Sequence, residues 1–331
     1  MIVTRSLCDS DVITPYSNYL LNKPQATFFH TIYYYNSMKK TPGVNPVSIV
    51  LSDSYNNVKA AAIGELANEI SFIPYFTKRL ILYAHPLFET QNDLIVLLKS
   101  LNQINAGLFI QIRSFSGFSD DELAIYNRFG YVRNDHLNAY ISLKGMSDNS
   151  IFEKFKKDKR KGIRNAERRY KLTIQETSDT EYSVDIFYDM LKKLYRRKRH
   201  AMKNKTYFLN LINESNGNAR IAFAVYKDTP IAVQLYVIYK SHISAMYTAT
   251  LKEHMNKHAG DLLVWYLIKK GIEHGCDIFD FGGGGDPAIP YSPRDYKARF
   301  GTEFHNVGRL NLPKSFLYRS SMWLYKKFLK S

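Results

Sequence analysis

Residues 262–281 read LLVWYLIKKGIEHGCDIFDF, and four glycines follow directly at 282–285. Apolar side chains, among them Leu262, Trp265 and Ile268, recur at helical spacing between residues 260 and 274. Gly275 ends this pattern, as glycine commonly does after the last turn of a helix. The next segment, 276–281, is short and largely apolar, which is typical of a buried strand. The stretch therefore predicts an amphipathic helix followed by a strand.

The same succession of elements is predicted twice along the chain. Each half offers two strands that pair, a third strand, a helix and a fourth strand. In the first half these are residues 47–51, 58–66, 79–88, 93–104 and 107–112, and in the second half 219–226, 231–239, 242–250, 260–274 and 276–281. A helix at 120–129, capped by Ser119, and a strand at 136–143 close the first half, whereas a strand at 304–312 and a helix at 315–330 close the second.

We therefore expect an α/β (α+β) protein with two tandem lobes, 1–148 and 149–331. Each lobe should contain a mixed, mostly antiparallel sheet flanked by helices. The second should open with a basic helix capped by Ser150 and end with an amphipathic one.

The net charge of +16 is concentrated in two segments. Residues 154–171 contain ten Lys and Arg against two acidic residues, and residues 191–205 contain eight and none. Such segments suit a polyanion: nucleic acid, a pyrophosphate-bearing precursor or an anionic membrane face. The alternative is that both are ordinary solvated faces of surface helices.

The composition favours a cytoplasmic protein. Cys8 and Cys276 are the only cysteines, which argues for a reducing compartment and against a disulfide framework. No apolar run is long enough to span a membrane, and the N-terminal residues lack the pattern of a signal peptide. His254 and His258 are four apart, but no third ligand accompanies them, so we expect no metal site.

The order of the elements resembles that of the GNAT acyltransferase fold. Three segments resemble the FemAB-like acyltransferases that form peptidoglycan bridges, in addition to residues 262–285: FFHTIYYY at 28–35, RKGIRNAERRY at 160–170 and YKARFGTE at 296–303. The resemblance implies two GNAT-like lobes. It also implies transfer of an aminoacyl or acyl group onto an amine of a cell-envelope precursor, in peptidoglycan or polysaccharide biosynthesis.

The resemblance assigns catalytic roles to Lys297 and Tyr296, because the family's matching lysine and its aromatic neighbour line the transfer site. The chemistry agrees with this assignment. When an amine attacks an ester or thioester carbonyl, an oxyanion develops, and a fixed cation beside it lowers the barrier. The alternative is a surface lysine at a strand edge.

Further residues are expected to bind the substrate. The family carries an arginine about ten residues before an aromatic pair, here Tyr207 and Phe208, which favours Arg197 over Arg199 as a phosphate ligand. Lys39, after the resembling N-terminal segment, could hold acceptor phosphates. Phe281, Gly282 and Gly283 are expected near the substrate because glycines let backbone approach a ligand closely; the alternative is a flexible loop.

His258 and Gly260 precede the helix at whose N-terminus GNAT enzymes bind the donor pyrophosphate. The glycine pattern there is degenerate, which weakens an acyl-CoA assignment and favours aminoacyl-tRNA. Either donor is a substrate, so no other cofactor is implied. The expected partners are tRNA and a lipid-linked or nucleotide-linked envelope precursor.

Two alternative functions remain open. One is an acyl-CoA-dependent N-acyltransferase of surface polysaccharide biosynthesis. The other is a non-catalytic module that binds a polyanion or a membrane surface. The basic, aromatic helix expected at 315–330 could contact the inner face of the cytoplasmic membrane, or simply pack on its own lobe.

Overall fold

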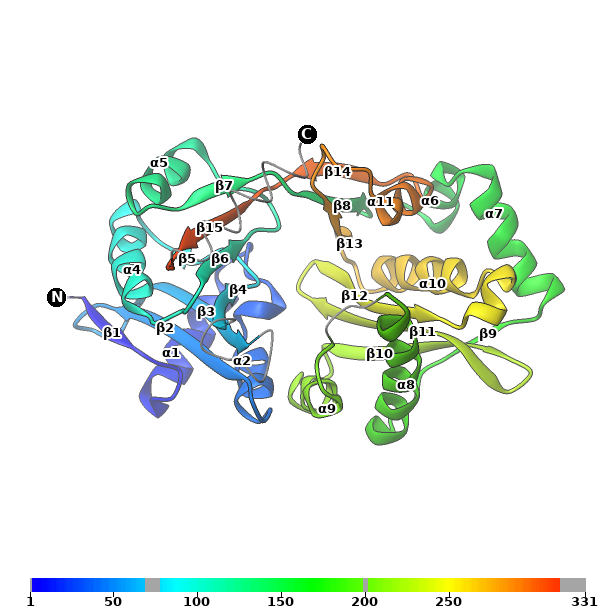
Figure 1. Cartoon of the computed structure of the whole chain (residues 1–331), viewed down its shortest axis with the longest axis horizontal. Coiled ribbons are helices and arrows are strands. Elements are labelled where there is room, and N and C mark those ends of the chain that lie inside the picture. The colour runs from blue at the N-terminus through cyan, green and yellow to red at the C-terminus, as the bar shows by residue number, and fades with distance from the viewer. Residues whose placement is uncertain (1, 69–77, 199–201, 316–331) are drawn as a thin grey trace. The chain divides into compact units, whose positions relative to one another are not determined.

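The computed structural model describes residues 2–68, 78–198 and 202–315, which contain two sheets (Figure 1). The chain divides into two compact units. The first combines Met1–His136 with Val307–Ser331, and the second comprises Leu137–Asn306. This division differs from the expected lobes because one strand from each half of the chain belongs to the sheet of the other unit.

The first unit contains one mixed sheet with helices beside it. Its strands, in spatial order, are β1 (Val3–Arg5), β2 (Asn45–Ser52), β3 (Val58–Asn68), β4 (Lys78–Leu82), β6 (Phe109–Arg113), β15 (Arg309–Pro313) and β7 (Val132–Asn134), and β5 (Leu87–Phe88) also pairs with β3. Its helices are α1 (Ser10–Leu21), α2 (Ile32–Lys39), α4 (Gln91–Gln103) and α5 (Asp120–Arg128). The Ser119 side chain caps α5, as predicted.

The second unit repeats this arrangement. Its strands, in spatial order, are β9 (Thr173–Gln175), β10 (Ala219–Tyr226), β11 (Thr229–Tyr239), β12 (His242–Thr250), β13 (Ile278–Gly285), β8 (Leu137–Ser142) and β14 (Glu303–Asn306). Its helices are α6 (Asp148–Lys154), α7 (Lys157–Arg164), α8 (Thr180–Lys198), α9 (Lys205–Glu214), α10 (Ala259–Glu273) and α11 (Ser292–Ala298). A π-helical turn, Asn165–Arg169, continues α7, and a 3₁₀ segment, Lys252–Lys257, precedes α10.

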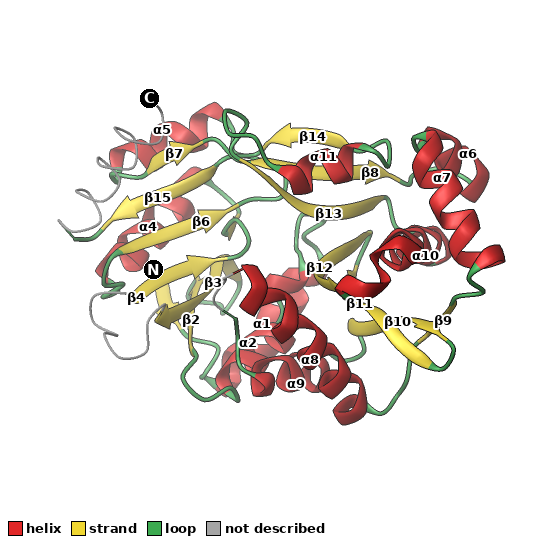
Figure 2. Ribbon diagram, turned by 45° about the vertical axis from the view of Figure 1, so that its right-hand side comes forward, coloured by secondary structure: helices red, strands yellow, loops and turns green. Residues whose placement is uncertain are grey.

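Both sheets place one parallel pair among antiparallel neighbours. β4 runs parallel to β6, and the chain between them contains α4. Likewise, β12 runs parallel to β13, and the chain between them contains α10. The prediction of two mixed, mostly antiparallel sheets is therefore confirmed. In addition, each half of the sequence contributes one strand to the sheet formed mainly by the other half: β15 lies between β6 and β7, and β8 lies between β13 and β14 (Figure 2).

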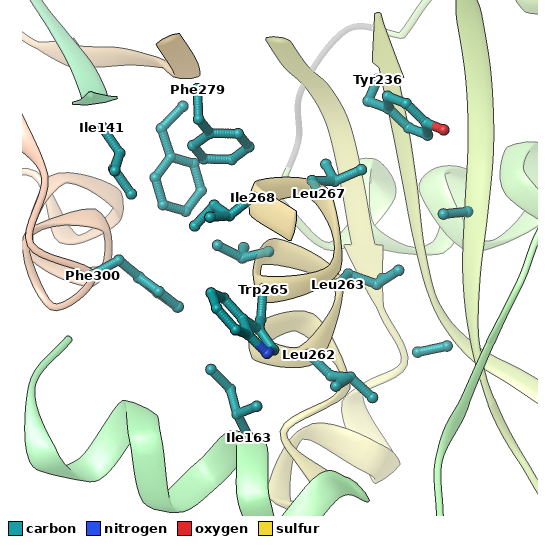
Figure 3. Packing of buried hydrophobic residues seen from close by; sticks show 14 of the residues in the cluster. Ile141, Ile163, Tyr236, Leu262, Leu263, Trp265, Leu267, Ile268, Phe279 and Phe300 are labelled. Carbon is teal, nitrogen blue, oxygen red and sulfur yellow. The ribbon is translucent and has the colours of Figure 1, made fainter. Parts of the chain in front are cut away.

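The core of the second unit fixes the position of α10. β11 is buried at every position from Ile231 to Val237, which indicates that both faces of the sheet are covered. Apolar side chains of α10, including Leu263 and Ile268, are buried in the same cluster as Phe279 of β13 (Figure 3). An aromatic group extends this core: the Phe155 ring lies 5.7 Å from Trp265 of α10 and 5.2 Å from Phe300, just after α11.

Three details differ from the sequence-based predictions. The strand expected at 304–312 is two strands, β14 and β15, in different sheets, because Gly308 at φ +70° turns the chain between them. Residues 282–285 belong to β13 and are not a loop. Ser147, rather than Ser150, caps the helix that opens the second half. Of the helix expected at 315–330, all but Ser315 lies outside the described residues.

No helix in the described ranges combines the length and the apolar character that crossing a bilayer requires.

Candidate transfer site in the second unit

The parallel strands β12 and β13 separate soon after they pair. Their pairing covers only three positions, ending at Ser244 and Asp280, although β12 continues to Thr250 and β13 to Gly285. Where they separate, Gly282 of β13 faces β12: a Cβ atom built on Gly282 would lie 3.7 Å from the carbonyl oxygen of Ala245. Lys297 of α11 reaches this region, since its Nζ would lie 3.8 Å from the same Cβ atom.

Lys297 is held beside the glycines of β13. Its Nζ donates a hydrogen bond of 2.9 Å to the carbonyl oxygen of Gly283 and lies 5.4 Å from the centroid of the Phe281 ring. Burial lowers the pKa of Lys297 to about 8, and the charge of Asp280 opposes this shift. The lysine is therefore a partly desolvated cation close to its titration point at neutral pH.

Asp280 is the acidic counterpart of Lys297. Burial raises the pKa of its carboxyl to about 6, while the Gly282 N–H, which donates to Asp280 Oδ1 at 2.7 Å, and the charge of Lys297 pull it down. Gly282 adopts φ +77°, a conformation that L-residues rarely adopt. The glycines thus shape the backbone beside the Lys297 ammonium and the Asp280 carboxylate. Because residues 282–285 belong to β13, the alternative that they form a flexible loop is wrong.

Tyr296 belongs to a buried polar network. Its hydroxyl donates to Asp261 Oδ1 at 2.8 Å, and Lys159 Nζ pairs with the same oxygen at 2.7 Å. The Lys159 ammonium also lies 4.1 Å from the centroid of the Tyr296 ring. Only 7% of Lys159 and 6% of Asp261 is exposed, so each charge depends on the other for compensation.

This network joins three helices: Lys159 lies on α7, Asp261 in the first turn of α10 and Tyr296 on α11. Burial and the neighbouring Asp261 carboxylate hold the pKa of the Tyr296 phenol well above its usual range, so the phenol keeps its proton. The network therefore fixes Tyr296, and with it the adjacent Lys297.

His258 and Gly260 lie at the start of α10, beside this network. His258 is the N-cap residue, at φ +59°, and its Nδ1 is 3.4 Å from Asp261 Oδ2. A Cβ atom on Gly260 would lie 3.9 Å from the Tyr296 hydroxyl and 3.2 Å from Thr250 Oγ1. The segment expected to bind the donor, which contains His258 and Gly260, thus directly precedes Asp261, the residue that accepts the hydrogen bond from Tyr296.

The structure therefore groups seven of the expected site residues: Lys297, Tyr296, Phe281, Gly282, Gly283, His258 and Gly260. Arg197 is exposed on the last turn of α8, and Tyr207 and Phe208 are buried, so the aromatic pair belongs to the core. Lys39 is exposed at the end of α2, in the first unit. Arg199 lies outside the described residues.

Sequence reasoning missed Lys159, Asp261 and Asp280 as part of this group. Lys159 has no distinguishing neighbour pattern among the basic residues of its segment. Asp280 could have been noticed as the carboxylate within an apolar strand, immediately before Phe281 and the glycines. In the part of the chain that the structure describes, no three His, Cys, Asp or Glu side chains are placed to hold a metal ion.

Comparisons with known proteins agree with this architecture. Residues 153–298 match the family model described as an acetyltransferase (GNAT) domain, and this range includes all seven residues grouped around Lys297. This part of the second unit is thus similar to GNAT acetyltransferase domains, and the match supports an acyltransferase. No curated protein matches the sequence.

Solved structures extend the likeness to both units. The crystal structure of FemX has a TM-score of 0.71 at 14% identity, over 98% of this chain and 99% of that one. A tandem GNAT protein from the clavulanic acid biosynthesis pathway has a TM-score of 0.59 at 12% identity, over 95% and 99%. L-PGS from Bacillus licheniformis has a TM-score of 0.55 at 16% identity, over 85% and 88%. The resemblance to FemAB-like enzymes is therefore confirmed for the fold.

Proposed function

We propose that the protein transfers an aminoacyl group from aminoacyl-tRNA to an amine of a lipid-linked or nucleotide-linked cell-envelope precursor. One observation carries this proposal: a partly buried ammonium, Lys297, is fixed against the Gly283 carbonyl where β12 and β13 separate. The likeness to FemX in fold supports the choice of reaction class.

The chemistry needs little from the protein beyond placement and charge. The acceptor amine attacks the ester carbonyl of the donor, a C–N bond forms, and the carbonyl oxygen becomes negative. Lys297 would stabilise this oxyanion, an effect worth about 3–4 kcal/mol for a preorganised donor in a water-poor site. As the intermediate collapses, the C–O bond to the donor ribose breaks, and the proton lost by the amine balances the departing alkoxide. No covalent enzyme intermediate is required.

The charge of the chain supports a tRNA donor. Lys156, Lys157 and Lys161 are exposed around α7, in the same segment that supplies the buried Lys159. Phosphates of a nucleic acid are the natural ligands of such a surface. Arg197, and Lys39 in the first unit, remain proposed ligands for precursor phosphates.

The second candidate is an acyl-CoA-dependent N-acyltransferase acting on a sugar nucleotide or polysaccharide. It is favoured by the family match of residues 153–298, since that family is described as acetyltransferases. Both candidates use Lys297 in the same way and differ in the donor and in the acceptor.

The deciding experiment is a transfer assay with the purified chain, with aminoacyl-tRNA or acetyl-CoA as donor and UDP-linked muropeptide as acceptor. We expect product from aminoacyl-tRNA and a loss of about 10²–10³-fold in Lys297→Ala. Lys99→Ala, an exposed lysine on α4, is the matched control and should behave as the parent. Turnover of Lys297→Ala within twofold of the parent would refute the role of Lys297. Binding without transfer would favour the non-catalytic module.

A further inference from the structure

A second feature of this unit is a pocket beside the segment that leads into α10. Two stretches of chain form it: residues 169–173, after the π-helical turn, and residues 225–228, at the tip of the β10–β11 hairpin. Its volume is about 410 Å³, within the usual range of small-ligand sites, and it is open to solvent on one side. None of the grouped residues around Lys297 lines it.

The pocket combines two aromatic rings with several cations. Tyr170 and Tyr226 are partly exposed, and Lys257 Nζ lies near both rings, 5.3 Å from the centroid of the first and 4.8 Å from that of the second. Arg169 lies 5.4 Å from the Tyr170 centroid and Lys227 lies 5.6 Å from that of Tyr226. Lys171 is a further basic residue that lines the pocket, and Asp228 is the acidic one.

The backbone on both sides is fixed by local hydrogen bonds. Lys227 and Asp228 have φ +46° and +63° and form the two-residue turn of a hairpin in which Tyr226 pairs with Thr229. On the other side, the N–H of Tyr170 donates to the Asn165 carbonyl at 2.9 Å. The two rings are therefore presented by constrained turns, which reduces the entropy lost when a ligand binds.

The pocket is connected to the transfer site through a short segment. Lys257 immediately precedes His258, the N-cap of α10, and the His254 ring lies 6.1 Å from that of Tyr226. Asp261, one turn into α10, binds the Tyr296 hydroxyl. A ligand that extends from Lys297 across the start of α10 would therefore reach this pocket with its far end.

We propose that this pocket binds a nucleotide of the donor, its base against Tyr170 and Tyr226 and its phosphate against Lys257, Arg169 and Lys227. Aromatic faces stack on any base, and surrounding cations neutralise the phosphate. Two donors contain this chemistry: coenzyme A, with its 3′-phosphoadenosine, and tRNA, with unpaired nucleotides before the esterified adenosine. The link to the donor depends on the proposed function, whereas the nucleotide affinity does not.

Binding is measured in a Lys297→Ala background, so that turnover cannot interfere. The probes are adenosine 3′,5′-bisphosphate, an RNA minihelix with an unpaired CCA end and the same minihelix with a blunt end. We expect Tyr226→Ala to weaken at least one of the first two probes about tenfold, because a stacked base is lost, and to leave the blunt minihelix unchanged. Tyr226→Phe keeps the ring and should bind as the parent. Tyr182→Ala, an exposed tyrosine on α8, is the control.

Lys257→Glu is the second variant, since it changes charge and leaves both rings in place. It should weaken the same probe. If these variants weaken binding of the bisphosphate alone, the donor is of the CoA type. If they weaken binding of the CCA minihelix alone, the donor is tRNA. The proposal is overturned if folded Tyr226→Ala and Lys257→Glu bind both probes as tightly as the parent, or if the blunt minihelix weakens equally. Failure of the parent protein to transfer from either donor would reject the proposed function without altering this result.

Discussion

Lys297 and Asp280 carry opposite charges and lie close together in a partly buried site. Burial lowers the pKa of the lysine and raises that of the aspartate, so both values move toward pH 7. Lys297 titrates near pH 8 and Asp280 near pH 6. Each group thus limits the pH range in which the pair is charged, and the cation that an oxyanion needs is present below about pH 8.

The first prediction concerns this alkaline limit. As pH rises through about 8, Lys297 loses its proton and kcat/KM for transfer should fall, even though the acceptor amine becomes more nucleophilic. Lys297→Arg keeps a cation at all these pH values and should shift the fall to higher pH, at a lower maximum rate. The measurement is kcat/KM between pH 6 and pH 10. An alkaline limb that is identical in Lys297→Arg would contradict the assignment.

Unfolding cannot produce the same fall through Lys297. Its folded pKa, about 8, lies below the ordinary value of 10.5, so the unfolded state binds more protons between these values. The contribution of Lys297 to folding stability therefore increases from pH 8 to pH 10.5. A thermal-denaturation series over the same pH range serves as the control.

The second prediction concerns Gly282. Gly282→Ala should lower stability by about 1 kcal/mol, because alanine is strained at φ +77°, and should also lower the transfer rate by disturbing the N–H that binds Asp280. Gly145→Ala is a matched control: Gly145 has φ +67° and open space around its Cβ position. It should lose similar stability in urea denaturation and keep full activity. Equal activity losses in the two variants would argue against a local role for Gly282.

At the scale of elements, the Lys159–Asp261–Tyr296 network binds α7, α10 and α11 together. Lys159→Met leaves the Asp261 carboxylate buried without its counter-charge, which should cost about 3–5 kcal/mol of unfolding free energy. Lys157→Met, an exposed position on the same helix, should cost less than about 0.5 kcal/mol. Chemical denaturation measures both. If the two variants were equally stable, the buried pair would not be what joins these helices.

The exposed part of the same segment provides a fourth prediction. Charge reversal at Lys156, Lys157 and Lys161 should weaken tRNA binding and flatten its salt dependence, by roughly 0.7 in log–log slope for each phosphate that the protein no longer neutralises. Charge reversal at Arg197 should instead weaken acceptor binding, because a carboxylate cannot bind the precursor phosphates as the guanidinium does. Titrations of both variants with both ligands, at several salt concentrations, test the separation. If both variants lost affinity for both ligands to the same extent, the two basic segments would form one undivided binding surface.

Element-scale features also show what sequence reasoning can reach. Helix α4 was predictable because its apolar residues recur on one face. Helix α10 was predictable because its apolar residues form a run of helical length that ends at a glycine, and the β10–β11 hairpin because a short turn separates two apolar runs. The burial of Lys159 was not predictable, since most of the surrounding residues are charged and its partner lies about a hundred positions away. The site around Lys297 could be located from its motif, but its Asp280 and Asp261 partners depend on how three helices and a strand meet.

At the scale of the whole molecule, the exchange of β8 and β15 could not be predicted, because short apolar strands do not specify their partners. It has a measurable consequence. Residues 137–306 form a complete sheet and should fold cooperatively as an isolated fragment. Residues 1–136 lack β15, which pairs with both β6 and β7, and should fail to unfold cooperatively.

Appending residues 307–315 to the fragment 1–136 should restore a cooperative transition, as followed by circular dichroism in urea. A fragment 1–136 that is as stable as its extended form would show that β15 is dispensable to the first unit.

The position of β15 also matters while the chain is being synthesised. Translation completes β7 at Asn134, but its neighbour β15 ends only at Pro313, after every strand of the second unit has emerged. At ribosomal rates of about 5–20 residues per second, the edges of β6 and β7 stay open for roughly 10–40 s. Open edges are templates for pairing with other chains. The half of the protein that is made first is therefore the half that matures last, and its nascent sheet is the part most in need of a chaperone.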